Sequence, residues 1–368
     1  MKPLFGKHSE FIVRSQSPFN GGPPPLRIIQ SQITPNDLFF VRSHGDVPEV
    51  NVDKYRLEVT GKVTKHLSLS MDEIKNKFER VTVPATLQCA GNRREELIRL
   101  KPIPKELPWG TEAIGHAMWT GVRLRDVLAG SGVDGEAGIR LHVDFVGLDE
   151  TERLGQGFNY GGSIPLSKAM KGDVILAYEM NGEELPPPHG FPLRVVVPGY
   201  IGARSVKWLT RITVQDDPSA NYFQRKAYRF FSPQTNAENV KWDEGMMLGE
   251  SNVTSVICSH QDGDQISAGI VTVQGYAMAG GERDVARVDV SHDGGKTWTQ
   301  AELTDDAQRW SWQLWHVDLN LKAGNHQLVV RAVDSAANVQ PKDIEDVWNF
   351  KGYMNNAWHR VNIVTKKK

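Results

Sequence analysis

Alternating apolar and polar residues predict half-buried strands in the first two thirds of the chain. Residues 139–146 show the pattern most clearly, because Ile139, Leu141, Val143 and Phe145 share one face and polar residues separate them. Further strands are expected at residues 38–44, 55–59, 82–87, 174–178 and 193–198, the last two more continuously apolar.

Helical patterns are few in the same region. Ser70-Met-Asp-Glu73 forms a capping box and predicts a short helix from Met71 to about Lys77. Strands with few helices indicate an α+β fold rather than a regularly alternating parallel sheet. Residues 1–36 are rich in Pro and Gly and are typical of an extended arm that lies over a domain.

The last 120 residues or so have an all-β pattern. A connector with little periodicity spans about 215–250, and strands are then expected at 270–274, 285–290, 310–314 and 328–332. Asp293-Gly-Gly295 is a strong hairpin signal before Trp298. This spacing predicts a β-sandwich of immunoglobulin type, without the paired cysteines of antibody domains. We therefore expect an arm (1–36), a first domain (37–235) and a second domain (236–368).

Composition excludes several functional classes. The chain has 43 basic and 44 acidic residues and a formal net charge of −1, so it has no global attraction to nucleic acid or to a membrane. Two cysteines form no disulfide framework, and no apolar run is long enough for a membrane span. No export signal is seen in the sequence as written, which predicts a cytoplasmic protein, or a periplasmic one if a leader was removed.

One segment concentrates candidate chemistry: residues 85–94, Ala-Thr-Leu-Gln-Cys-Ala-Gly-Asn-Arg-Arg. Arginines beside Cys89 would favour its thiolate, which binds metals, although a buried structural cysteine fits the same pattern. The sequence lacks a GxGxxG after a strand, a P-loop, HExxH and GxSxG. Basic residues near the predicted loops suit an oxyanion or a phosphate: Arg42, Arg93, Arg94, Arg194, Arg204 and Lys207.

Several motifs together resemble the eukaryotic-type sulfite oxidase family, from about residue 35 onward. They lie, in order, at 39–44 (FFVRSH), 85–94 (ATLQCAGNRR), 176–182 (LAYEMNG), 189–198 (HGFPLRVVVP), 202–208 (GARSVKW), 288–298 (VDVSHDGGKTW) and 356–361 (NAWHRV). The resemblance implies a sulfite oxidase molybdopterin-binding fold, followed by an immunoglobulin-like dimerisation domain. It also implies a molybdenum enzyme with one pyranopterin per chain and no haem, which oxidises sulfite to sulfate by oxygen-atom transfer. Electrons would pass to an external acceptor such as a c-type cytochrome.

The resemblance also implies roles for individual residues. Cys89 would be the one protein ligand to molybdenum. The substrate pocket would contain Arg42, Arg94, Trp109, Tyr228 and Lys351. The cofactor would be held by Phe40, Val41, Arg42, Ser43, His44, Asp149, His189, Arg194, Ser205, Val206 and Lys207, with Arg93 and Arg204 as supports.

Two positions depart from the family pattern. Trp109 lies one residue later than the usual spacing from the cysteine. Lys351, in Trp-Asn-Phe-Lys-Gly, replaces the family's arginine, which keeps the charge but loses the planar fork, so weaker or differently oriented anion binding is expected. Two alternatives stay open: a nitrate-reducing molybdenum enzyme, against which Tyr228 argues, and a non-catalytic interaction protein on the same scaffold.

Overall fold

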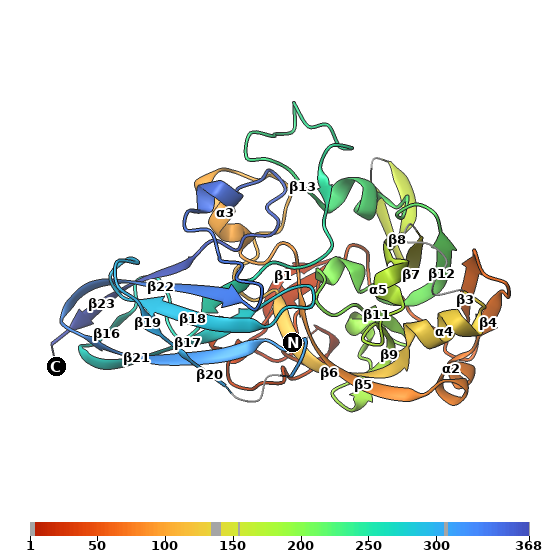
Figure 1. Ribbon diagram of the computed structural model, residues 1–368, viewed down its shortest axis with the longest axis horizontal. Coiled ribbons are helices and arrows are strands. Elements are labelled where there is room, and N and C mark those ends of the chain that lie inside the picture. Colours follow the sequence, from red (N-terminus) through yellow and green to blue (C-terminus); the bar gives the residue numbers. More distant parts are fainter. Residues whose placement is uncertain (1–3, 134–140, 154, 305–307, 368) are drawn as a thin grey trace.

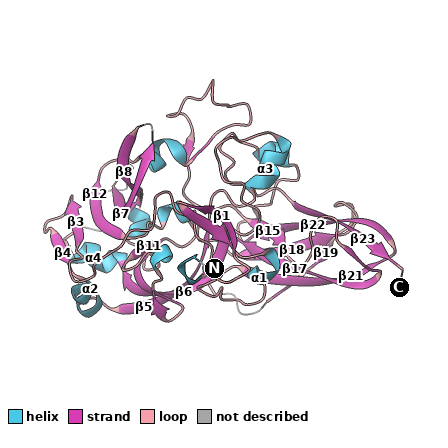
Figure 2. Cartoon of the chain, turned by 180° about the vertical axis from the view of Figure 1, so that it is seen from behind, coloured by secondary structure: helices cyan, strands magenta, loops and turns pink. Residues whose placement is uncertain are grey.

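The computed structural model describes residues 4–133, 141–153, 155–304 and 308–367. Two strand-rich parts lie side by side along the long axis (Figure 1). The part that contains β16 (Gln265–Ser267) to β23 (His359–Lys366) also contains the C-terminus, and the N-terminus lies near the junction between the two parts. Seen from behind, most helices belong to the first part, whereas the second consists mainly of strands (Figure 2).

The N-terminal segment does more than lie over a domain. It contains β1 (Ile12–Gln16), β2 (Phe19–Gly22) and α1 (Pro25–Ile28). Strands β1 and β2 form an antiparallel ribbon. Phe11 and Phe19 are buried against Val41, so the segment has a small apolar core of its own. The composition of residues 1–36 did not predict this burial.

Two five-stranded sheets build the first part. One has the order β10 (Glu183–Glu184), β9 (Ile175–Met180), β6 (Ile114–Arg123), β5 (Arg80–Gln88), with β11 (Arg194–Val196) also paired to β9. The other has the order β4 (Leu67–Leu69), β3 (Leu57–Gly61), β12 (Leu209–Gln215), β7 (His142–Arg153), β8 (Gln156–Pro165). Only the pair β3–β12 is parallel among these described strands.

Short helices connect these strands: α2 (Met71–Lys77), α3 (Arg94–Leu100), α4 (Leu124–Gly130) and α5 (Leu166–Ala169). The capping box is confirmed, since the Ser70 hydroxyl accepts from the Glu73 N–H at 3.1 Å and the Glu73 carboxylate accepts from the Ser70 N–H at 3.0 Å. In β7, Val143 and Phe145 are fully buried as the alternation predicts; Ile139 lies outside the described residues. Burying each of these large side chains contributes about 1.5–3 kcal/mol.

Residues 38–44 do not form the strand that their apolar pattern predicts. They form turns and irregular backbone, with one isolated bridge in which Val41 pairs with Gly21 of the N-terminal ribbon. The N–H groups of Leu38 and Phe39 bond to the Pro35 carbonyl in a turn, and only Val41 pairs with the ribbon, so this segment is a loop.

The connector holds the π-helix η4 (Phe223–Ala227) and the short pair β13 (Arg229–Phe230) and β14 (Met246–Met247). After it, two sheets enclose a second core. One has the order β15 (Thr254–Ile257), β17 (Gly269–Met278), β21 (Gln313–Leu321), β20 (Glu302–Leu303). The other has the order β16 (Gln265–Ser267), β23 (His359–Lys366), β22 (Gly324–Asp334), β18 (Val285–Ser291), β19 (Thr299–Gln300).

Side chains from both of these sheets share that core, among them Val273, Trp315, Val290 and Val330. The Asp293–Gly295 turn joins β18 to β19, as the hairpin signal predicts. The strand expected at 310–314 begins only at Gln313. Among the residues described, no helix combines the length and apolarity that crossing a lipid bilayer would require.

The two parts are held together beside Cys89. Leu97 of α3 packs with Val347, in the 3-10 helix η5 (Ile344–Val347), and with Ala357. In Figure 1, α3 accordingly lies next to the C-terminal segment. Residues that follow Cys89 in the sequence are therefore brought against residues 344–357.

Candidate active site

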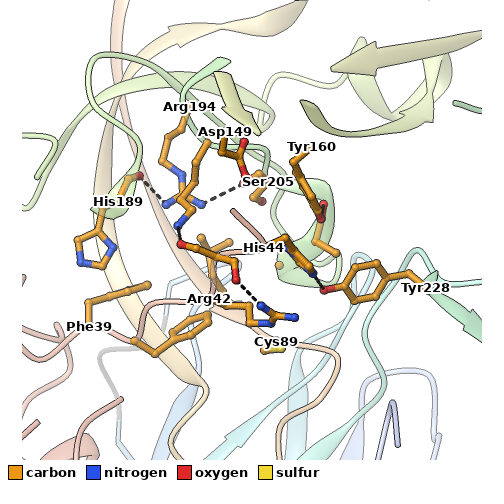
Figure 3. A pocket seen from close by; sticks show the side chains of 16 residues that line it. Phe39, Arg42, His44, Cys89, Asp149, Tyr160, His189, Arg194, Ser205 and Tyr228 are labelled. Atoms are coloured by element: carbon orange, nitrogen blue, oxygen red, sulfur yellow. Dashed lines mark hydrogen bonds between the residues drawn. The ribbon is translucent and has the colours of Figure 1, made fainter. Parts of the chain in front are cut away.

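A cavity lies beside Cys89, where loops from several strands converge (Figure 3). It encloses about 620 Å³ of space outside the protein atoms, part of it open to solvent. It is lined by Phe39, Phe40, Arg42, Ser43, His44, Leu87, Cys89, Asp149, Tyr160, His189, Arg194, Gly202, Ala203, Ser205, Lys207 and Tyr228. These residues span much of the first part of the chain, so tertiary folding assembles the cavity.

The loop before β3 supplies one wall and is held by the N-terminal segment. Val41 exchanges two backbone hydrogen bonds with Gly21, at 2.8 and 3.0 Å. The Asn20 side chain accepts from the Ser43 N–H at 2.8 Å and from Arg42 Nη1 at 3.3 Å. Gly45 ends the loop against β7, where a Cβ atom would lie 1.9 Å from the Glu150 carbonyl oxygen. Glycine therefore permits this close approach.

Cys89 lies directly after β5, and its side chain enters the cavity. Its N–H donates to the Ala113 carbonyl at 2.9 Å, which fixes the backbone, and only 6% of the residue is exposed. The Gly91 N–H donates to Sγ at 3.3 Å. Cysteine binds metals through its sulfur, and the Cys89 sulfur is held in place beside this backbone N–H group.

Arg42 extends towards Cys89 in the close view (Figure 3). Burial alone would lower its pKa, but the nearby Tyr228, Cys89 and Tyr353 hold that pKa above its usual value. Arg42 therefore keeps its positive charge beside the cysteine side chain in a largely buried site.

Two further cations line the opposite wall. Arg194 donates to the His189 carbonyl at 2.9 Å and to the Ser205 carbonyl at 3.2 Å. Lys207 donates to Ser43 Oγ at 2.7 Å and to the Pro188 carbonyl at 2.8 Å. Burial lowers the pKa of Arg194 to about 9, and burial followed by the Arg194 charge lowers the pKa of Lys207 well below its usual value. An anion bound here would relieve the cost of burying both charges.

Asp149 is the one acid among the described residues that line the cavity. Burial raises its pKa, although the Lys207 charge opposes that shift. Its Oδ1 is buried and has no hydrogen-bond partner within the described part of the chain. A buried polar atom without a partner is costly, so this oxygen is available to a donor on a bound ligand.

His44 and Tyr228 form a hydrogen-bonded pair, with Nε2 and the phenol oxygen 2.9 Å apart. Burial, followed by the Arg42 charge, lowers the pKa of His44 well below 6.5, so the ring is neutral. Burial raises the pKa of Tyr228, which therefore keeps its proton. Tyr160 stacks on His44 with ring centres 4.6 Å apart, and Tyr353 stacks on Tyr228 with ring centres 5.0 Å apart. The rings of His44 and Tyr228 are therefore fixed.

Lys7 of the N-terminal segment reaches His189 from outside the cavity wall. Its ammonium lies 2.8 Å from His189 Nε2 and donates to the carbonyls of Phe39 (2.8 Å) and Asn36 (2.7 Å). Burial lowers the pKa of Lys7 to about 7, and the residue is 4% exposed. Three acceptors thus match the three N–H groups of this lysine.

Arg94, Trp109 and Lys351 lie beside the cavity and are not among its lining residues. Arg94 donates to the Gly352 and Leu107 carbonyls, both at 3.0 Å, and its guanidinium lies 5.0 Å from the Tyr353 ring centre. Trp109 is fully buried. Lys351 donates to the carboxylate of Glu106.

The other predicted residues form three groups. Most of the predicted cofactor residues line the cavity: Phe40, Arg42, Ser43, His44, Cys89, Asp149, His189, Arg194, Ser205 and Lys207. Val41 and Val206 are buried in apolar clusters instead, so any contact from them to a ligand would use the backbone. Arg93 binds both carboxylate oxygens of Glu96 at 2.7 Å, and Arg204 donates to the Leu248 carbonyl at 2.7 Å, as supports do.

Several site residues were missed from the sequence. Phe39, Leu87, Tyr160, Gly202 and Ala203 line the cavity; all but Tyr160 lie within the quoted motifs. Lys7, Asn20 and Glu106 act from outside the cavity, and only contacts across long sequence separations reveal them.

The donor set fits a thiolate-bound metal with an anionic organic cofactor. A single cysteine sulfur faces a cavity that contains Arg42, Arg194 and Lys207, and the unpartnered Asp149 oxygen awaits a donor. Soft thiolate suits a soft metal centre, and the buried cations suit a phosphate. A pterin with its phosphate would supply an anion for these cations and ring N–H donors for the Asp149 oxygen.

Comparisons with known families divide the chain in two. Residues 44–223 match the family model described as "Oxidoreductase molybdopterin binding domain". Residues 246–366 match "Mo-co oxidoreductase dimerisation domain". The first match contains the cavity, apart from the residues of 39–43 and Tyr228.

Individual relatives agree with these models. The chain is 40% identical to sulfite oxidase of Arabidopsis thaliana, covering 96% of this chain and 94% of that protein. It is 47% identical to mitochondrial sulfite oxidase of Homo sapiens over 97% of this chain, and it spans 66% of the human protein. The crystal structure of the sulfane dehydrogenase SoxCD from Paracoccus pantotrophus superposes with a TM-score of 0.78 at 27% identity, covering 98% of this chain and 90% of that one.

Proposed function

The chain belongs to the sulfite oxidase family, and on this premise we propose that it oxidises sulfite to sulfate with a molybdenum–molybdopterin cofactor. The observation that carries the proposal is the Cys89 thiol, which enters a cavity whose other charged groups are mostly cationic. Such a cavity suits a thiolate-bound metal, an anionic cofactor and an oxyanion substrate together.

Cys89 would hold the metal, while Arg194, Lys207, His189 and Asp149 would hold the pterin and its phosphate. When bound, this cofactor supplies the oxygen-atom transfer and accepts two electrons. The protein's own contribution is placement: backbone carbonyls fix Arg194 and Lys207, and the buried Lys7 contacts His189. The Phe40–His44 loop would close the site from the side of the N-terminal segment.

Arg42 and Arg94 would bind the oxyanion. Arg94 is buried and Arg42 is half-buried, so their attraction for an anion is screened less than on an open surface. Tyr228 keeps its proton, and its hydroxyl can donate to an oxygen in the cavity while its ring stays fixed between His44 and Tyr353. Trp109 would contribute by excluding water, since it is fully buried in the apolar cluster that contains Cys89.

The organisation of the chain supports further parts of the proposal. We assign residues 37–235 to the cofactor domain and 236–368 to an immunoglobulin-like domain that forms a homodimer, as the second family model's description suggests. The external electron acceptor would be a protein such as a c-type cytochrome. A cytoplasmic location, or a periplasmic one after removal of a leader, remains the expectation.

Paired assays test the proposal. Cofactor-loaded protein is mixed with sulfite and oxidised cytochrome c, and separately with nitrate and a reduced viologen dye. Cytochrome reduction that depends on sulfite, without viologen oxidation by nitrate, is expected. Turnover of nitrate instead would favour the nitrate-reducing alternative. Turnover of neither, in protein shown to contain molybdenum, would favour the non-catalytic one.

A further inference from the structure

An ion pair between two segments that are distant in the sequence lies beside the cavity. The first segment, between Cys89 and Trp109, contains Glu106, and the second, directly before Gly352, contains Lys351. In the structure the Glu106 carboxylate, from the first of these segments, accepts a hydrogen bond from Lys351 Nζ. We propose that Glu106 is an internal counterion that weakens oxyanion binding beside the cavity; this rests on the proposed function.

The pair lies within a cluster of cations. Glu106 and Lys351 are each 17% exposed, and Arg94 is 2% exposed. Glu106 Oε2 lies 3.7 Å from Arg94 Nη1. Burial would raise the pKa of Glu106, but Arg94, Lys351 and then Arg42 hold it below its usual value, so Glu106 is ionised. The Glu106 carboxylate thus neutralises part of the positive charge that would otherwise attract an oxyanion.

Arg94 cannot move away from this carboxylate. Its Nε and Nη1 bind the carbonyls of Gly352 and Leu107, which are the neighbours of Lys351 and Glu106 in the sequence. Gly352 has a φ of +62°, and a Cβ there would lie 2.6 Å from Arg94 Cγ, so both backbone shape and space require glycine. The arginine is therefore built into the same two segments that carry the ion pair.

Lys351 is the movable member of the cluster. Its four-carbon stem can rotate, and its ammonium is a point charge rather than a rigid fork. While it is bound to Glu106, its charge is compensated and it adds little to the attraction for an anion. An incoming oxyanion must share Arg94 with Glu106 or draw Lys351 away from it, and either process lowers affinity for substrate and product.

The test compares oxyanion affinity with and without the Glu106 charge. Sodium sulfate is titrated into cofactor-loaded protein by calorimetry, and KM is measured for sulfite. Glu106→Gln should tighten sulfate binding and lower KM by about fivefold, the size of one partly exposed ion pair. Glu95→Gln, which removes a carboxylate from the exposed pair with Arg99, should change neither value.

Two further variants show whether Lys351 carries the effect. Lys351→Met should weaken sulfate binding, and in its background Glu106→Gln should give a clearly smaller gain than in the wild type. Lys351→Arg should tighten sulfate binding, since a fork can bind the carboxylate and an anion together. No gain from Glu106→Gln in either background overturns the proposal.

Two controls exclude a folding defect. The melting temperature of each variant is measured, and Glu106→Asp, which keeps the charge, should bind sulfate as weakly as the wild type. If Glu106→Asp binds sulfate as tightly as Glu106→Gln, charge is not the cause and the proposal is wrong. The calorimetric titration needs no turnover. A wild type that fails to oxidise sulfite would refute the proposed function, while the sulfate affinities would still decide the role of Glu106.

Discussion

Replacing Lys7 with methionine tests whether the N-terminal segment belongs to the site. Methionine fills a similar volume without the ammonium, so three acceptors lose their donor: the carbonyls of Asn36 and Phe39, and His189 Nε2. Each unsatisfied buried acceptor lowers the free energy of unfolding by about 1–3 kcal/mol, whereas removing a buried ammonium raises it and so offsets part of this loss. We expect a net loss of about 1–3 kcal/mol in the free energy of unfolding.

The same change should loosen the cofactor. Without Lys7, His189 loses one of the contacts that orient its ring, so pterin and molybdenum content should fall when the loaded protein is dialysed. The assay is urea unfolding of cofactor-free protein, with molybdenum and pterin measured on loaded protein. Lys54→Met, at an exposed lysine, is the matched control.

The pH dependence gives a second signature. The pKa of Lys7 is about 7 in the folded protein against an ordinary 10.5, so the folded state holds fewer protons between these values. Stability contributed by a lysine with a lowered pKa therefore rises with pH across this window, by at most about 1.4 kcal/mol per pH unit. The deficit of Lys7→Met should be larger at pH 9 than at pH 7. Equal stability and equal cofactor retention in both proteins would refute the reasoning.

Other predictions follow from the same geometry. Tyr228→Phe should lower kcat for sulfite roughly ten- to hundredfold by removing one donor, and it should lower the melting temperature slightly because His44 Nε2 loses its partner; an unchanged kcat would exclude the hydroxyl from the reaction. Arg194→Met should lower molybdenum and pterin content several-fold, measured by elemental analysis and pterin fluorescence, whereas Arg99→Met at an exposed site should not. Cofactor-free protein should lose stability as the pH falls below about 6.5, because His44 and His189 have folded pKa values well below the ordinary one and protonation favours the unfolded chain. Melting temperatures that do not fall between pH 7.5 and 5.5 would contradict this.

Local patterns predicted the elements that local interactions determine. The capping box at Ser70 and the burial of Val143 and Phe145 need only neighbouring residues, and both are confirmed. Residues 38–44 were predicted wrongly as a strand, because the backbone of Val41 pairs with Gly21, which no periodicity shows.

The site divides in the same way. Cys89, Arg42 and Lys207 lie in motifs that are long enough to be recognised, and the structure brings them to one cavity. Lys7 contacts His189 across 182 residues, and Lys351 contacts Glu106 across 245. Such contacts depend on how the segments pack together, so a sequence pattern around either partner could not have indicated them.

Metal coordination by Cys89 is the central claim, and X-ray absorption at the molybdenum edge measures it most directly. Wild-type protein and Cys89→Ser are loaded with cofactor, and equal pterin content is verified in both. We predict one sulfur neighbour fewer around molybdenum in Cys89→Ser, together with loss of sulfite oxidation. An unchanged number of sulfur neighbours and a wild-type rate would contradict the account.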